Sequence, residues 1–209
     1  MLIRDSRDLE TLEWQKMDGL LPAIVQDAFD GRVLMQAYMN REALAYSLDN
    51  GVVTFWSRSK ERLWTKGETS GNTLDLVEIH VDCDRDCLLV RARPEGPTCH
   101  MGTDTCFDAE GRVIPELAFL ADLERVIAQR DIDRPADSYT TALLESGVRR
   151  IAQKVGEEGV ETALAAVGGE DDEVLNESAD LIYHLLVLLR SRKLELGSLV
   201  EVLKIRHGG

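Results

Sequence analysis

The chain is organised around residues 82–107, which read DCDRDCLLVRARPEGPTCHMGTDTCF. All four cysteines of the protein lie in this window, and three aspartates alternate with other residues at its start. Successive side chains of an extended chain point to opposite faces, so Asp82, Asp84 and Asp86 would project together while Cys83 points the other way. The apolar run at the centre of the window predicts a strand. We therefore predict two neighbouring cation sites of different character in the front half of the chain.

The two groups of side chains suit different metals. Carboxylate oxygens suit a hard cation such as Mg²⁺, which keeps several of its waters, whereas Cys83, Cys99 and Cys106 suit Zn²⁺. Three thiolates leave one position on a tetrahedral zinc open, and water in that position becomes a nucleophile near neutral pH. A disulfide framework and buried free thiols are the alternatives. Cys87 is the extra thiol, and for it we expect simple burial.

Composition bounds the class of protein. The chain has 209 residues, 44% of them hydrophobic and 30% charged, as in a soluble globular protein of one or two domains. Its net charge of −14 argues against a nucleic-acid-coating role but permits phosphorylated substrates held through a metal ion. The start of the chain lacks the apolar core of a signal peptide, and no apolar run reaches the roughly 20 residues of a membrane span. We expect a cytoplasmic protein without membrane or nucleic-acid partners.

The residues before the aspartates predict a β-rich α+β domain. Strand patterns cover residues 21–28, 33–38, 52–57 and 74–81. Asp30 and Gly31 form a hairpin turn between the first two strands. Asn40 is a good cap for a helix that ends before Gly51. We predict an antiparallel sheet in a first domain that spans residues 1–112.

The polar stretch from Arg58 to Asn72 is a second concentration of chemistry. Its four basic residues stand out in an acidic protein, and its glycines, serines and threonines could offer donors to a phosphate. A solvated loop between strands is the alternative, and composition alone does not separate the two interpretations.

The second half of the chain predicts helices only. Leu117, Leu120 and Leu123 begin an apolar stripe at helical spacing. Further helices are predicted over residues 138–167 and 173–193, with a short last helix capped by Ser198. Helices joined by short loops indicate an all-α bundle, which we assign to residues 113–209.

Acidic pairs recur on two of these helices. Glu158 and Glu161 are three residues apart and share a face, and Glu177 and Asp180 repeat the arrangement on the next helix. The second pair precedes residues 181–189, an apolar segment that we expect to be buried. Facing carboxylates in a bundle core make a site for Mg²⁺, and solvated helix faces are the alternative.

Three further residues, Lys154, Glu157 and His184, lie close to the acidic pairs on the same two predicted helices. Lys154 lies one turn before Glu158 on the same face. For His184, one turn after Asp180, we favour a satisfied core histidine over a metal ligand. Glu157 could reach the site or face solvent.

The motifs resemble two known families. The front half is similar to phosphoribosyl-AMP cyclohydrolase in SR at 57–58, LWTKGETSGN at 63–72, DCDRD at 82–86, GPTCH at 96–100 and CF at 106–107. The back half resembles phosphoribosyl-ATP pyrophosphohydrolase in KVGEEGVE at 154–161 and ESADLIYH at 177–184. Together they cover nearly the whole chain, in the order of the bifunctional enzyme of histidine biosynthesis. The resemblance implies a multidomain protein whose helical bundle is of the nucleotide pyrophosphohydrolase type.

The resemblance also implies two consecutive reactions. The helical domain would hydrolyse phosphoribosyl-ATP between the α- and β-phosphates, with Mg²⁺ on Glu158, Glu161, Glu177 and Asp180 and with Lys154 as a catalytic phosphate contact. The front domain would then open the adenine ring of phosphoribosyl-AMP at the N1–C6 bond.

The site of ring opening follows from the same resemblance. Zinc would bind Cys83, Cys99 and Cys106, drawn from both subunits of a homodimer, so an isolated monomer would be inactive. Asp82, Asp84 and Asp86 would hold Mg²⁺ near the substrate phosphate. His100 is a candidate proton shuttle, with a structural role as the alternative. The implied substrate contacts are Arg58, Trp64, Lys66, Gly67, Glu68, Ser70, Gly71 and Asn72.

Two other functions compete with this interpretation. A zinc-stapled interaction module fused to a helical dimerisation bundle would show a closed four-ligand zinc site and no use for the acidic pairs. Alternatively, the bundle could hydrolyse aberrant nucleotides, because the ExxE…ExxD pattern is shared by a wider superfamily of nucleotide pyrophosphohydrolases.

Overall fold

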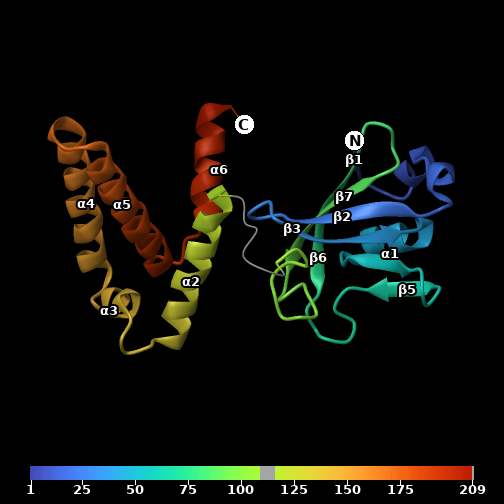
Figure 1. The fold of residues 1–209 in the computed structure, drawn as a ribbon, viewed down its shortest axis with the longest axis horizontal. Coiled ribbons are helices and arrows are strands. Elements are labelled where there is room, and N and C mark those ends of the chain that lie inside the picture. The colour runs from blue at the N-terminus through green and yellow to red at the C-terminus, as the bar shows by residue number, and fades with distance from the viewer. Residues whose placement is uncertain (109–115, 209) are drawn as a thin grey trace. The chain divides into compact units, whose positions relative to one another are not determined.

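A computed structural model describes residues 1–108 and 116–208, which form two compact units, Met1–Ala118 and Phe119–Gly209 (Figure 1). The first unit is rich in strands and the second is helical, which confirms the predicted fold class. The predicted boundary between residues 112 and 113 lies outside the described residues. Each unit has its own cluster of buried apolar side chains, so each unit has a separate hydrophobic core.

Five strands form the main sheet of the first unit, in the order β1-β6-β7-β2-β3. The strands are β1 Leu2–Ile3, β2 Leu21–Asp27, β3 Val33–Met39, β6 Leu74–Val81 and β7 Leu88–Pro94. Three of the four pairings are antiparallel, as predicted, whereas β2 and β7 run parallel with Val25 opposite Val90. The parallel pair joins strands far apart in the sequence, and local turn signals do not reveal such a pairing.

Buried and partly exposed side chains alternate along these segments, as expected for strands with one buried face. In β2, the side chains of Leu21, Ala23 and Val25 are fully buried, and the residues between them are partly exposed. The predicted continuation of the extended chain through residues 82–86 is wrong, however. β6 ends at Val81, and the chain turns before β7, with Arg85 in the left-handed region at a φ of 65°.

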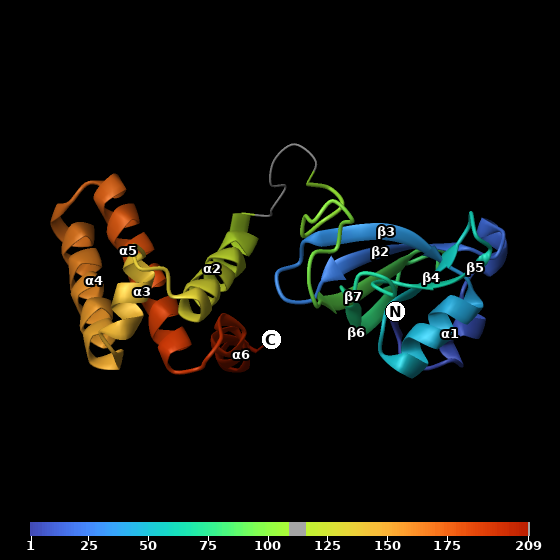
Figure 2. The ribbon, with the colours of Figure 1, turned by 90° about the horizontal axis from the view of Figure 1, so that it is seen from below.

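The remaining elements of the first unit surround the sheet. Strands β4 Thr54–Ser57 and β5 Arg62–Thr65 form a separate two-stranded sheet, and α1 Arg41–Asn50 packs against β3, β4 and β5 (Figure 2). The predicted cap of α1 is correct, because the Asn40 side chain accepts a 2.8 Å hydrogen bond from the backbone N–H of Ala43. Near the start of the chain lie two short 3-10 helices, η1 Asp8–Thr11 and η2 Trp14–Met17.

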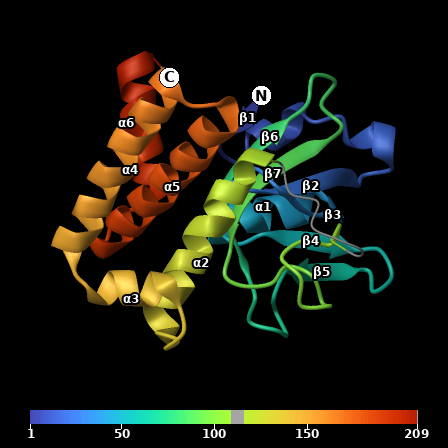
Figure 3. The ribbon, with the colours of Figure 1, turned by 60° about the vertical axis from the view of Figure 1, so that its left-hand side comes forward.

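The first unit ends with a 3-10 turn, η3 Glu116–Ala118, and the described part of the second unit contains five α-helices. They are α2 Phe119–Asp133, α3 Tyr139–Glu145, α4 Val148–Gly168, α5 Asp171–Ser191 and α6 Leu196–His207. Helices α4 and α5 pack side by side as an antiparallel hairpin (Figure 3). The single helix predicted over residues 138–167 is broken at Gly147, whose φ of 82° lies outside the helical region. The last helix begins at Leu196 rather than at Ser198.

The apolar segment 181–189 is only partly buried within one chain. Leu186 and Val187 lie in the core of the second unit, whereas Ile182 is 42% exposed. Across the described residues, no helix combines the length and the apolarity that crossing a membrane requires.

Candidate functional site

A pocket of about 400 Å³ in the first unit gathers most of the residues implied in ring opening. It forms where β5 and the turn after it meet the loop that follows β7. Its lining includes the predicted residues Trp64, Lys66, Gly67, Glu68, Ser70, Asn72, Cys99, His100 and Cys106. Its other lining residues are Thr69, Pro97 and Thr98, which belong to the quoted motifs but had no assigned role, and Met35 and Gly102, which the sequence did not single out. We call this the thiol pocket.

The two thiols of the pocket lie side by side. The thiols of Cys99 and Cys106 are close enough to influence each other's pKa, and a hydrogen bond from the backbone N–H of Met101 holds the pKa of Cys99 below its ordinary value. His100 Nδ1 lies 3.9 Å from Cys99 Sγ. Lys66 is buried beside the thiols, and this burial lowers its pKa. Adjacent sulfurs, one of them predisposed to ionise, fit two ligands of a zinc ion.

Thr98 is a lining residue with an unusual environment. It is buried, and its hydroxyl oxygen has no hydrogen-bond partner within residues 1–108 and 116–208. A buried hydroxyl without a partner is costly, so this group is suited to contact a bound molecule.

Cys83 does not join the other two thiols within one chain. The backbone N–H of Cys106 donates to Leu34 on β3, whereas Cys83 lies in the turn between β6 and β7. Because β2 separates β7 from β3, about 10 Å of sheet lies between these positions, and sulfurs on one zinc lie within about 4 Å of one another. Accordingly, no cluster of ligand atoms in the described part of the chain unites all three thiols. The described part of one chain therefore forms no site from all three thiols.

All four cysteines are free, so the disulfide interpretation is wrong. Cys87 is half-buried, and this burial raises the pKa of its thiol.

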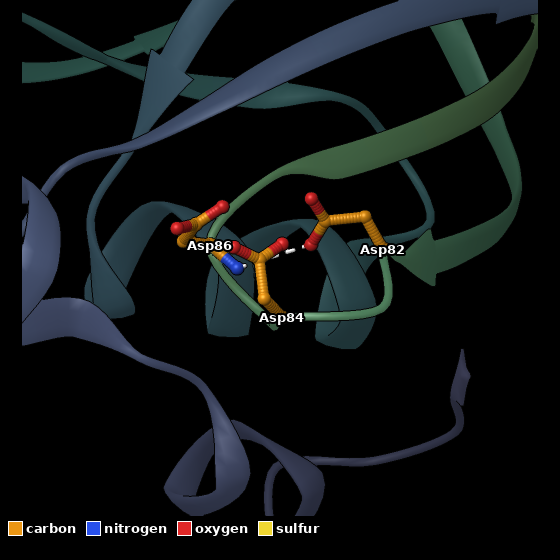
Figure 4. A group of neighbouring side chains, drawn as sticks. All are labelled: Asp82, Asp84 and Asp86. Carbon is orange, nitrogen blue, oxygen red and sulfur yellow. Dashed lines mark hydrogen bonds between the residues drawn. The ribbon is translucent and has the colours of Figure 1, made fainter.

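Asp82, Asp84 and Asp86 do converge, with carboxylate oxygens within 4.8 Å of one another (Figure 4). The turn brings them together, rather than the alternation of a strand. One oxygen of Asp82 accepts the backbone N–H groups of Asp86 and Cys87, both at 3.1 Å, and this fixes the turn. Three carboxylates that share a small space fit a hard cation such as Mg²⁺.

Lys16 lies against the same carboxylates. Its Nζ is 3.4 Å from Asp84 Oδ2 and 3.3 Å from Asp86 Oδ2, and it lowers the pKa of Asp84. Neither spacing nor composition connects Lys16 with residues about 70 positions away, so the sequence could not reveal this contact. The ammonium supplies positive charge where a metal ion would also supply it.

In the second unit, α4 and α5 bring three predicted carboxylates together. Oxygens of Glu158, Glu161 and Glu177 lie within 4.8 Å of one another, and Glu158 is buried. Partial burial and the neighbouring carboxylates raise the pKa of Glu177. Mutual repulsion of this kind is relieved by a divalent cation, so the three side chains fit Mg²⁺. Asp180, one turn further along α5, is exposed and stands outside this group of described side chains.

Lys154 and His184, which lie next to the three glutamates, both interact with other residues of the second unit. Lys154 Nζ lies 2.6 Å from Glu158 Oε1 and 3.2 Å from Glu157 Oε2, and it holds the pKa of Glu158 below its ordinary value. His184 is buried, with Nδ1 donating to the Asp180 carbonyl at 2.8 Å and Nε2 3.1 Å from the hydroxyl of Tyr139. His184 is thus a satisfied core histidine. Tyr139 carried no signal in the sequence.

Two implied substrate contacts lie outside the lining of the thiol pocket. Arg58 lines a second pocket, together with Trp64. Gly71 stands in the turn after β5 with a φ of 81°.

Comparisons with known proteins match each unit to one family. The family model of Phosphoribosyl-AMP cyclohydrolase matches residues 35–108, and that of Phosphoribosyl-ATP pyrophosphohydrolase matches residues 120–207. The Histidine biosynthesis bifunctional protein HisIE of Xanthomonas axonopodis pv. citri is 60% identical over 200 residues, which cover 95% of this chain and 94% of that protein. The chain belongs to the family of histidine biosynthesis bifunctional proteins.

Other members of this family match the chain to a similar extent. The protein of Photobacterium profundum with the same printed name is 58% identical over 200 residues, 94% of this chain and 97% of its own length. That of Vibrio cholerae is 54% identical over 198 residues, 95% and 94% of the two lengths.

Membership of the histidine biosynthesis bifunctional family settles the class of function. The chain is a bifunctional enzyme with a cyclohydrolase domain and a pyrophosphohydrolase domain, which confirms the resemblance in the motifs. The interpretation as a non-catalytic interaction module is therefore wrong. The thiol pocket and the turn that carries Asp82, Asp84 and Asp86, which we call the aspartate turn, lie in the unit matched to the cyclohydrolase. The group of Glu158, Glu161 and Glu177 lies in the unit matched to the pyrophosphohydrolase.

Proposed function

We propose that the chain acts on phosphoribosyl-ATP with its helical unit and on the product, phosphoribosyl-AMP, with its strand-rich unit. The cyclohydrolase domain is assigned to residues 1–112 and the pyrophosphohydrolase domain to residues 113–209. The observation that carries the proposal is that each matched unit gathers candidate metal ligands: Asp82, Asp84 and Asp86 and the thiols of Cys99 and Cys106 in the first, and Glu158, Glu161 and Glu177 in the second.

The helical unit hydrolyses its substrate between the α- and β-phosphates and releases pyrophosphate. Glu158, Glu161 and Glu177 would hold Mg²⁺. Asp180, which lies outside their cluster one turn further along α5, is a fourth candidate ligand. When bound, Mg²⁺ supplies positive charge that offsets the triphosphate and orients water. Lys154 keeps Glu158 ionised and is the candidate phosphate contact, because its ammonium stands beside the carboxylate group.

The strand-rich unit opens the adenine ring at the N1–C6 bond. The thiol pocket receives the base, with Trp64 as an apolar wall and Lys66, Glu68, Ser70 and Asn72 as polar contacts. When bound by Cys99 and Cys106 and by the partner's Cys83, zinc supplies an activated water for attack on C6.

Proton transfer and phosphate binding complete the ring-opening site. His100 lines the pocket beside Cys99 and is the candidate proton shuttle. Gly67 and Gly71 shape the turn that carries Ser70. The aspartate turn, Asp82 to Asp86, holds Mg²⁺ near a substrate phosphate. The active form is a homodimer in the cytoplasm, where thiols remain reduced.

Two substitutions test the assignment of the two reactions. Cys99→Ser should stop ring opening and leave pyrophosphate release from phosphoribosyl-ATP intact. Glu161→Gln should stop pyrophosphate release and leave ring opening of supplied phosphoribosyl-AMP intact. Ring opening is followed by absorbance and pyrophosphate by a coupled assay in the same samples. Equal loss of both activities from either substitution, in protein with an unchanged melting temperature, would contradict the proposal of independent sites.

The substrate of the helical unit needs its own comparison. Purified protein should release pyrophosphate from phosphoribosyl-ATP much faster than from ordinary or oxidised nucleoside triphosphates. Faster release from oxidised nucleotides would favour the hydrolysis of aberrant nucleotides instead.

A further inference from the structure

The second pocket of the first unit, which we call the Arg58 pocket, has a volume of about 570 Å³. It is lined by Gln36, Ala37, Tyr38, Trp56, Ser57, Arg58, Ser59 and Trp64. Trp64 also lines the thiol pocket, so the two pockets share a wall. A ligand that contacts Trp64 is therefore close to residues of both pockets.

Arg58 is held in place without using its charge. The centre of its guanidinium lies 4.0 Å from the centroid of the Tyr38 ring, the stacked arrangement that attracts a cation to an aromatic face. Among the described residues, no carboxylate forms an ion pair with Arg58, whereas Arg62 in the same hairpin is paired with Glu68 at 2.5 Å. A cation–π contact does not consume the N–H donors of a guanidinium. Arg58 is thus an exposed cation, in contact with Tyr38, whose N–H groups can bind an anionic ligand.

The residues on both sides of Arg58 add hydroxyl groups. The backbone N–H of Lys60 donates to Ser57 Oγ at 3.3 Å, which occupies an acceptor position and leaves the hydroxyl hydrogen free to donate. The Ser59 hydroxyl lines the same pocket. One guanidinium fork and two hydroxyl groups match the oxygens of a phosphate monoester. The rings of Tyr38, Trp56 and Trp64 provide apolar walls for a sugar.

We infer that the Arg58 pocket binds a phosphorylated ribose arm of the nucleotide whose base occupies the thiol pocket. The inference rests on the proposed function, because that function supplies a base with a phosphorylated ribose on each of two ring nitrogens. The Arg58 pocket accounts for one of the two phosphates through direct hydrogen bonds. Binding energy from this arm holds the ring in position without touching the bond that breaks.

The experiment compares Arg58→Gln with the matched control Lys60→Gln in the full-length protein. Both substitutions remove one positive charge from the same turn, but Lys60 is exposed and lines neither pocket. Ribose 5-phosphate is titrated against tryptophan fluorescence, because Trp56 and Trp64 line the Arg58 pocket, and unphosphorylated ribose serves as the ligand control. We expect Arg58→Gln to weaken binding of ribose 5-phosphate by about tenfold or more and Lys60→Gln to change it by less than about twofold.

Steady-state kinetics give a second readout. Arg58→Gln should raise the KM for phosphoribosyl-AMP with little change in kcat, while pyrophosphate release by the helical unit stays at the wild-type rate and reports an intact fold. Four results would overturn the inference: no saturable signal with ribose 5-phosphate in the wild type, equal weakening by both substitutions, equal affinity for ribose, or a loss of kcat with unchanged KM. A shift of Arg58→Gln from dimer to monomer on size-exclusion chromatography would also overturn it, because the pocket would then be a subunit contact.

The same data separate this inference from the proposed function. If the wild type binds ribose 5-phosphate through Arg58 but opens no ring, the proposed function fails and the subsite stands. If the ring is opened while sugar phosphate binding is independent of Arg58, the subsite fails and the proposed function stands.

Discussion

The variants Cys83→Ser and Cys99→Ser should each be inactive in ring opening. When they are produced together in one cell, part of the ring-opening activity should return. Each substitution alone removes one thiol from every proposed zinc site. Cys99 lies beside Cys106, whereas Cys83 lies in a turn about two strand spacings away. The proposed site therefore combines Cys83 of one subunit with Cys99 and Cys106 of the other.

The size of the recovery follows from this arrangement. Random pairing of equal amounts of the two variants makes about half of the twofold dimers mixed. In each mixed dimer, one site carries both substitutions and the other carries neither. The co-expressed mixture should therefore contain about a quarter of the intact sites of the wild type, and show about a quarter of its ring-opening rate. Zinc content, measured by atomic absorption, should recover in parallel, and pyrophosphate release should stay at the wild-type level.

A second mixture is the control. Cys99→Ser and Cys106→Ser remove thiols from the same pocket of one chain, so each site of every dimer lacks one of them and no activity should return. The reasoning would be refuted if the Cys83→Ser and Cys99→Ser mixture stayed inactive although dimers formed, or if both mixtures recovered to the same extent.

Three further predictions concern single positions. Gly67→Ala should lower the free energy of unfolding in urea by about 1–3 kcal/mol more than Gly71→Ala does. Both glycines have a positive φ, but only at Gly67 would a Cβ lie 2.4 Å from a backbone oxygen. Equal losses of stability would contradict this. Lys16→Gln should tighten Mn²⁺ binding at the aspartate turn about fivefold, measured by electron paramagnetic resonance, because about 1 kcal/mol of repulsion between cations disappears; weaker binding would instead mean that the lysine orders the turn. Arg91 holds the pKa of Glu78 below its ordinary value of 4.5, so their pairing stabilises the protein above that pH and is lost as the pH falls through the lower folded-state pKa. Arg91→Gln should therefore cost up to about 1 kcal/mol at pH 7 and less once the pH falls below the folded-state pKa of Glu78. A loss of stability that does not depend on pH would contradict the pairing.

Local signals predicted most elements of the fold. Asn40 and Gly51 bound helix α1 as expected, because capping depends on a few adjacent backbone groups. Spacing along helices also placed Glu158, Glu161 and Glu177 on facing surfaces. The aspartates came together for a different reason from the one predicted, since a turn can gather alternate residues as well as a strand can.

Some misses are local, such as the helix break at Gly147, and others depend on residues elsewhere in the chain. Strand β5 lies in a polar stretch, and its pairing of Trp64 with Phe55 outweighs the local composition. The parallel pairing of β2 with β7 and the contact of Lys16 with the aspartates join segments far apart in the chain. The sequence places Arg58 in one polar stretch with the residues up to Asn72. In the structure, Arg58 contacts the ring of Tyr38 and lines a different pocket.

The separate cores of the two units have a consequence for how such a chain evolves. A substitution in one cluster, such as the one around Phe55, does not disturb the packing around Ile151 in the other. Selection can therefore adjust the throughput of one reaction while leaving the other half untouched. Because neither cluster contains residues of the other unit, each half can accept changes in its own packing independently.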